Sequence, residues 1–199
     1  MNRPLAASSV RSKGKLGRFP HAVFNVFDPK PERLLLDPDA TEAAFKAQSL
    51  DDFEIIPIAA REIAGAKIPD RAALVLRSDP KTGEDGLLQV REIRDLSLNA
   101  DLVTLSACDT SVGPLEGEEG VANLVRAFLF VGARSVVASL CTANDPSTRA
   151  LMERFYRYIA AGEDKGSALR HAQMDLIAEY GDRGTLLLGG LHPGGRRVR

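Results

Sequence analysis

The chain has 199 residues, of which 44% are hydrophobic and 27% are charged, and its formal net charge at pH 7 is −1. This composition is typical of one globular domain, and the balanced charge excludes the basic surface that general nucleic-acid binding requires. The sequence has two cysteines, no secretory signal at its start and no apolar run long enough to cross a bilayer. We therefore expect a cytoplasmic protein that binds neither nucleic acid nor membranes.

Residues 1–36 are expected to form a leader that is disordered or irregular. The first part of this segment is basic, small and polar, and no periodicity in it would bury a face. Residues 21–27 have the composition of a strand, but two prolines in the DPKPE stretch that follows interrupt it. From Asp39, a candidate N-cap, the spacing of several alanines and Phe45 predicts a short amphipathic helix.

The central part of the chain alternates between strand-like and helix-like segments. Short apolar runs predict buried strands at residues 54–60, 72–76, 101–106 and 134–140. Hydrophobic periodicity predicts helices at residues 89–96, 118–131, 146–161 and 165–180. Pro57 conflicts with the first strand, because proline removes a donor from the ladder of a central strand. The alternation predicts an α/β fold in which the four strands form one mostly parallel sheet.

The stretch DLVTLSACDTSVGPLEGEEG, residues 101–120, changes from strand to turn to helix and places Cys108 at the carboxyl end of a strand. In open α/β sheets ligands bind at that end, so the thiol is a candidate nucleophile. The residues alone favour the alternative that Cys108 is a small buried hydrophobic residue, because a lone cysteine beside an apolar run is more often that than a reactive group.

Three longer motifs, LSACDT, GEEGVANLVRAFLFVGARSVVASL and RFYRYIAAGEDKGSALRHAQ, resemble the carboxyl-terminal half of CHAT domains, which are caspase-like cysteine peptidases. The resemblance covers residues 40–182. It implies a caspase-like three-layer α/β/α sandwich with a mostly parallel sheet and a cysteine–histidine dyad at neighbouring strand ends. It implies no cofactor and no metal. Because family members often follow tetratricopeptide repeats, the implied partners are proteins or peptides, including such repeat regions.

When the family motif is compared with this sequence residue by residue, Cys108 stands at the nucleophile position of the family. In the dyad a histidine takes the thiol proton, and backbone amides near the cysteine stabilise the oxyanion. The resemblance makes Asp109, Thr110 and Asp145 candidates for the substrate pocket. Ser111 stands where the family usually has a glycine.

The histidine of the dyad is missing from the corresponding segment, IIPIAAREIAGAKIPDRAAL. Pro57 and Arg61 stand at the two family histidine positions, and Glu62 stands at the glycine that follows. A guanidinium stays protonated, so Arg61 is not expected to work as a base. The histidines of the chain are expected away from the sheet edge that carries Cys108: His21 in the leader, His171 on a helix and His192 in the tail.

The end of the chain also departs from the family. Residues 183–199 read RGTLLLGGLHPGGRRVR instead of an aromatic closing strand. Degenerate codons for residues 184–195, read one base later, can spell APFYWAGFTLV, so we hypothesise a frame-shifted tail. Cys141 and Asn144 stand where family members carry tryptophan and aspartate. We therefore expect a partial CHAT domain at residues 37–182, truncated so that the sheet is incomplete on its N-terminal side and at its closing strand.

Three functions stay open at this point. The chain is an active cysteine endopeptidase that uses Cys108, or a catalytically impaired module that binds other proteins, or a decayed gene fragment. The missing histidine favours the second and third, which rank equally. In the second case Arg61 and Glu62 form an altered but usable site.

Overall fold

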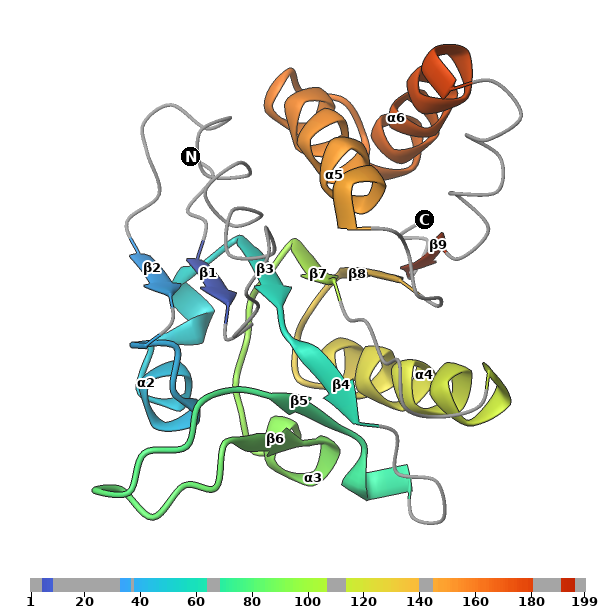
Figure 1. Ribbon diagram of the computed structural model, residues 1–199. Coiled ribbons are helices and arrows are strands. Elements are labelled where there is room, and N and C mark those ends of the chain that lie inside the picture. Colours follow the sequence, from blue (N-terminus) through green and yellow to red (C-terminus); the bar gives the residue numbers. More distant parts are fainter. Residues whose placement is uncertain are drawn as a thin grey trace.

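The structure is a computed structural model of the 199-residue chain (Figure 1). It describes residues 5–8, 33–36, 38–63, 69–106, 114–139, 145–180 and 191–195. The first half contains β1 (Leu5–Ser8), β2 (Arg33–Leu36), α2 (Glu42–Lys46), β3 (Ile55–Ala59), β4 (Arg61–Ile63), β5 (Ala73–Val75), β6 (Leu87–Gln89) and α3 (Val90–Ile93). The second half contains β7 (Leu102–Leu105), α4 (Pro114–Phe130), β8 (Ser135–Ser139), α5 (Asp145–Ala160), α6 (Lys165–Tyr180) and β9 (Leu191–Gly195).

The strands form two sheets. The main sheet has the order β2-β1-β3-β7-β8-β9, and its neighbours are parallel except for the antiparallel pair β8 and β9. The smaller sheet has the order β4-β5-β6 and is antiparallel. In Figure 1, α5 and α6 lie on one face of the main sheet, and α2, α3 and α4 lie on the other. The α/β class and the three-layer, mostly parallel arrangement are confirmed.

Strand β3 shows how the two faces of the main sheet are filled. Its five residues are all buried. Ile56 and Ile58 belong to the hydrophobic core that includes α2, α3 and α4, whereas Ile55 and Ala59 belong to the core formed with α5 and α6. Successive side chains of a strand point to opposite faces, so a strand covered on both faces is apolar throughout. This requirement explains why β3, β7 and β8 were predictable from apolar runs.

Pro57 fits into β3 because its backbone faces β1, where the ladder is short, rather than β7. The Leu102 amide donates to the Glu54 carbonyl at 3.0 Å, and the Ser106 amide donates to the Ile58 carbonyl at 2.9 Å. Backbone groups of successive residues point to opposite sides of a strand, so position 57 faces β1 rather than β7. The β1 ladder pairs only with the last two residues of β3. The missing proline donor therefore lies beside the start of that ladder.

The prediction that residues 72–76 belong to the main sheet is wrong. Strand β5 lies within that range and pairs antiparallel with both β4 and β6. Only residues 64–72 separate β4 from β5, whereas a return to a parallel position takes about a dozen residues or more. The short connection favours an antiparallel neighbour.

Both ends of the chain contribute strands that the sequence did not predict. β1 and β2 lie within the segment expected to be an irregular leader, and β9 lies within the segment expected to be an aberrant tail. The sheet therefore has strands on its N-terminal side and at its closing position, where the sequence predicted that it would be incomplete. The two N-terminal strands, LAAS and RLLL, do not alternate between apolar and polar residues, so they lack the period-two pattern by which a half-buried strand is recognised. The strand suggested at residues 21–27 lies outside the described residues.

A partly buried ionic cluster joins α2 to the β6 and α3 region. The Lys46 ammonium lies 2.6 Å from a Glu42 oxygen and 3.0 Å from oxygens of both Glu84 and Glu92. The Glu42 side chain is fully buried, and its second oxygen accepts a 2.8 Å hydrogen bond from the Gly86 amide. Burial raises the pKa of Glu42, against the hydrogen bonds from Lys46 and Gly86, which lower it. Burial alone would lower the pKa of Lys46, but the three carboxylates raise it above its ordinary value.

We expect Lys46→Met to lower the free energy of unfolding by about 3 kcal/mol at pH 7, because it leaves the buried Glu42 carboxylate without its counter-charge. The folded-state pKa of Glu42 is raised, so this carboxyl takes up a proton more readily in the folded than in the unfolded chain as the pH falls. The loss should therefore be smaller at pH 5 than at pH 7 in urea unfolding. Lys81→Met, at an exposed lysine, is the matched control. An equal loss of stability at both pH values would contradict the inference that Lys46 supplies the counter-charge of Glu42.

A buried hydroxyl pair joins β7 to α5. The Thr104 and Tyr156 hydroxyl oxygens lie 2.5 Å apart, and both residues are fully buried. Burial raises the pKa of Tyr156, so the phenol stays protonated and can donate. The contact spans the core on the α5 side of the sheet, on the strand that leads toward Cys108.

We expect Tyr156→Phe to cost about 1 to 3 kcal/mol of stability, because it leaves a buried threonine hydroxyl without this partner. Adding Thr104→Val should recover part of that loss, since both polar groups are then gone. Urea unfolding of the two single variants and the double variant measures the coupling. Strictly additive losses would show that the two hydroxyls do not stabilise each other.

Candidate active site

The carboxyl edge of the main sheet is formed by the ends of adjacent parallel strands. β3 pairs with β7 in a register that places Ile58 opposite Leu105. Arg61 lies two residues beyond the end of β3, and Cys108 lies three residues beyond the end of β7. The two positions therefore follow neighbouring strand ends at the same edge. The nucleophile position and two pocket candidates lie outside the described residues: Cys108, Asp109 and Thr110.

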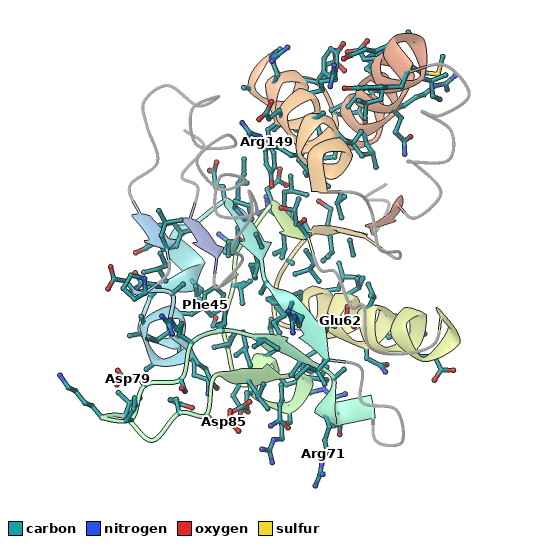
Figure 2. The ribbon with its side chains drawn as sticks, in the orientation of Figure 1. Phe45, Glu62, Arg71, Asp79, Asp85 and Arg149 are labelled. Atoms are coloured by element: carbon teal, nitrogen blue, oxygen red, sulfur yellow. The ribbon has the colours of Figure 1, made fainter. Side chains whose placement is uncertain are left out.

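Arg61 begins β4, and its side chain is exposed. It pairs with Val75 through the antiparallel ladder. Glu62 is only 2% exposed, and Figure 2 shows it in the region between β4 and α4. A guanidinium keeps its proton at all physiological pH values, so Arg61 cannot accept the proton of a thiol. It can bind a carboxylate through two parallel hydrogen bonds.

Asp145 is the first residue of α5, which follows β8 in the chain. Because β8 is parallel to β7, the start of α5 lies on the same carboxyl side of the sheet as the end of β7. The backbone position of this pocket candidate therefore agrees with a place at the site. Its side chain lies outside the described residues, as do Cys141 and Asn144.

His171 lies far from the carboxyl edge. Its Nδ1 is 2.8 Å from a Glu163 oxygen, and its ring packs against Tyr158 with ring centres 5.4 Å apart. Tyr158 lies roughly 20 Å along α5 from Asp145, given a rise of about 1.5 Å per residue. The histidine is exposed at the distant end of that helix, which agrees with a role outside the site.

His192, expected in the tail, lies in a strand of the main sheet. In β9 it pairs with Ala138, and Ala138 pairs with Leu105 of β7. Two strand spacings separate His192 from Leu105, which is roughly 10 Å between backbones. Cys108 lies three residues farther along the chain than Leu105. The LHPGG composition of β9 is atypical for a strand, which is why the sequence did not predict it. His21 lies outside the described residues.

Three carboxylates in the part of the chain that the structure describes have ligand atoms close enough to hold a metal ion: Glu42, Glu84 and Glu92. These atoms all lie within 4.8 Å of one another. The Lys46 ammonium contacts all three, so it occupies the place that a cation would take. The group is a structural ionic cluster on the α2 side of the fold.

The comparisons with known proteins agree with this architecture. The CHAT domain matches residues 8–185, which is most of the chain. The chain belongs to the CHAT domain family. This match begins in β1, so it reaches further toward the N-terminus than the resemblance over residues 40–182. No curated protein matches the chain.

Among solved structures, this CHAT domain is similar to the crystal structure of the Arg-specific cysteine proteinase gingipain R, with a TM-score of 0.63 and 10% sequence identity. The similarity covers 98% of the chain and 46% of the gingipain R chain. The chain thus spans less than half the length of that proteinase. At this identity the likeness establishes a caspase-like fold and nothing about activity. Within the described residues, no helix of this CHAT domain is both long and apolar enough to cross a membrane.

Chemical cross-linking tests the position of the nucleophile. The test variant carries Arg61→Cys in a Cys141→Ser background. We expect a short linker with two thiol-reactive groups to join Cys108 to the new thiol, because adjacent strand ends place the two side-chain tips within about 10 Å of each other. Mass spectrometry of digests identifies the linked peptides. Asp85→Cys in the same background is the control, since Figure 2 shows this exposed residue on a loop away from β4. Equal yields from both variants would refute the residue-by-residue assignment.

Proposed function

We propose that this chain is a CHAT domain protein related to caspase-like cysteine endopeptidases, that its peptide hydrolysis is impaired, and that it binds proteins or peptides. The observation that supports the proposal is the exposed Arg61 two residues beyond β3. The sequence resemblance assigns the family histidine to this position. The proposed nucleophile position is Cys108. The proposed pocket residues are Asp109, Thr110 and Asp145.

The chemistry of a dyad explains why the arginine matters. A free thiol is only a few per cent thiolate at neutral pH, and the histidine of a dyad both removes its proton and delivers a proton to the leaving amine. Arg61 does neither, although its positive charge favours the thiolate if the two groups lie close. Such a site supports stoichiometric thiol reactions but poor turnover.

The proposed partners are proteins or peptides, including tetratricopeptide-repeat regions, because CHAT domains often accompany such repeats. A cytoplasmic location is part of the proposal, since a reactive thiol persists in a reducing compartment. The proposal involves no cofactor and no nucleic acid.

We expect the chain to hydrolyse peptides no faster than its Cys108→Ala variant, because loss of a general base removes about 10² to 10⁴ in rate. A thiol alkylator should still modify Cys108 stoichiometrically, as mapped by mass spectrometry, because alkylation needs only exposure and some thiolate. Fluorogenic peptide libraries measure the turnover. Cysteine-dependent turnover by the unchanged chain would overturn the proposed impairment.

The double substitution Arg61→His with Glu62→Gly restores the dyad pattern. We expect little or no activity from it unless the closing strand of the family is restored as well. Arg61→His alone, with Glu62 kept, separates the effect of the base from that of the buried carboxylate. Full activity from the double variant would mean that the base was the only missing part.

A second candidate function is an active endopeptidase that uses Cys108 with a base outside the family position. The observation that favours it is the incorporation of His192 into β9, two strands from β7. His192→Ala tests this candidate in the same turnover assay. A third possibility, a decayed gene with a frame-shifted tail, is tested by the nucleotide sequence across codons 183 to 199, which either does or does not encode the family ending in another frame.

A further inference from the structure

Helix α6 carries apolar side chains on two sides. Four buried residues face the core of the domain: Ala168, Leu169, Ala172 and Leu176. Met174 is 56% exposed and Tyr180 is 45% exposed, and Ile177 between them is only partly buried. Because residues three apart adjoin on the surface of a helix, these three side chains form one stripe. The stripe lies outside both hydrophobic cores of the described residues.

This outer stripe lies on the flank of α6 that faces away from α5. On the flank toward α5, the Tyr158 hydroxyl donates a 2.8 Å hydrogen bond to Asp175, and Arg154 pairs with Glu179. A helix turns by about 100° per residue, so Ile177, two residues from each of these acidic residues, lies roughly 160° around the axis from both. In Figure 1, α5 runs beside α6, and no other described helix lies along its far flank. A helix that is apolar on both sides is typically covered on both sides.

The charge beside the outer stripe is positive. Arg170 lies one turn before Met174, its side chain is exposed, and among the described residues it forms no ion pair. The two acidic residues of α6 both lie on the opposite flank, in contact with α5. A second copy of this helix would therefore bring another arginine to the stripe and no carboxylate. A partner with an acidic side chain beside an apolar face complements the stripe better.

We infer that the outer stripe of α6, made by Arg170, Met174, Ile177 and Tyr180, binds an amphipathic helix of a partner protein, with an acidic side chain of that helix on Arg170. A helix satisfies its own backbone hydrogen bonds, so it can bind through side chains alone. From Arg170 to Tyr180 the stripe is roughly 15 Å long, which matches about three turns of a partner helix. The inference rests on the proposed function, because it names the class of protein segment that the chain binds. It requires neither a thiolate nor turnover.

Designed helical peptides test the inference. Each fluorescein-labelled peptide has about six turns of alanine and glutamine, with apolar residues every third or fourth position along one face. A glutamate one turn beyond the apolar residues at each end serves either orientation of the peptide on α6. The set varies the apolar residues among Leu, Ile, Met and Phe, and a matched set has glutamine in place of glutamate. The protein is the full chain carrying Cys108→Ala, so that binding is measured whether or not the unchanged chain cleaves peptides.

Fluorescence anisotropy measures the affinities. We expect the best glutamate peptide to bind about twofold to fivefold more tightly than its glutamine counterpart, as is typical of an exposed ion pair. Arg170→Gln should abolish that preference, whereas Arg157→Gln, at an exposed arginine of α5, should keep it. Met174→Gln should weaken binding of both peptides about fivefold, because it removes apolar area from the interface. Phe130→Gln, at a side chain of α4 that is 78% exposed, is the matched control and should leave binding unchanged.

These four positions are exposed, so the variants are expected to fold normally, which circular dichroism can verify. Methionine methyl NMR signals report where the peptide binds. The signal of Met174, assigned by its loss in Met174→Gln, should shift on peptide addition, whereas that of Met152, which is fully buried in α5, should not.

The inference is overturned if no peptide binds, if the glutamate and glutamine peptides bind equally, or if the Met174 signal stays unchanged when a peptide binds. A Met174 signal that shifts with protein concentration alone would assign the stripe to a second copy of the chain and would overturn the inference as well. The proposed impairment is judged separately by turnover of the unchanged chain, so either statement can fail alone.

Discussion

Burial of β3, β7 and β8 on both faces is the constraint on which the rest of the structure depends. Ile56 and Ile58 fill the core on the α4 side, while Ile55 and Ala59 fill the core on the α5 side. A parallel sheet covered in this way needs crossover connections that return each strand in the same direction. The carboxyl ends of these parallel strands therefore lie at the same edge of the sheet. That edge is where the chain positions Arg61, the start of α5 and the segment that leads to Cys108.

The sequence predicted this central part because its signal is local and strong. Apolar runs of four or five residues mark β3, β7 and β8, and long periodic segments mark α4, α5 and α6. The other strands depend on pairing rather than on composition. β5 has the same apolar character as β3, but a short connection pairs it antiparallel with β4. β9 contains a proline and two glycines, and only its ladder with β8 makes it a strand.

The polar contacts inside the fold show a second limit of prediction from the sequence. The pair Glu42 and Lys46 has i, i+4 helical spacing and is visible in the sequence. The contribution of Glu84 and Glu92 is not visible, because these residues lie far along the chain and meet Lys46 only after folding. The same holds for Thr104 and Tyr156, which meet across the sheet and α5. Such contacts follow from packing, so residue types and spacing cannot reveal them.

Arg61, which follows β3, bears on the chemistry of the proposed site but contributes little to the stability of the fold. The β4 ladder with β5 is made by main-chain groups, and the exposed side chain at position 61 adds nothing to either hydrophobic core. In the proposed assignment, arginine in place of histidine at position 61 removes a proton acceptor without a penalty in packing, so the fold places little restraint on such an exchange. The neighbouring Glu62 differs, because a carboxylate that is 2% exposed must be compensated by its surroundings. Under the proposed assignment, a substitution at position 61 therefore changes the chemistry of the site while the β4–β5 ladder that holds this position is kept.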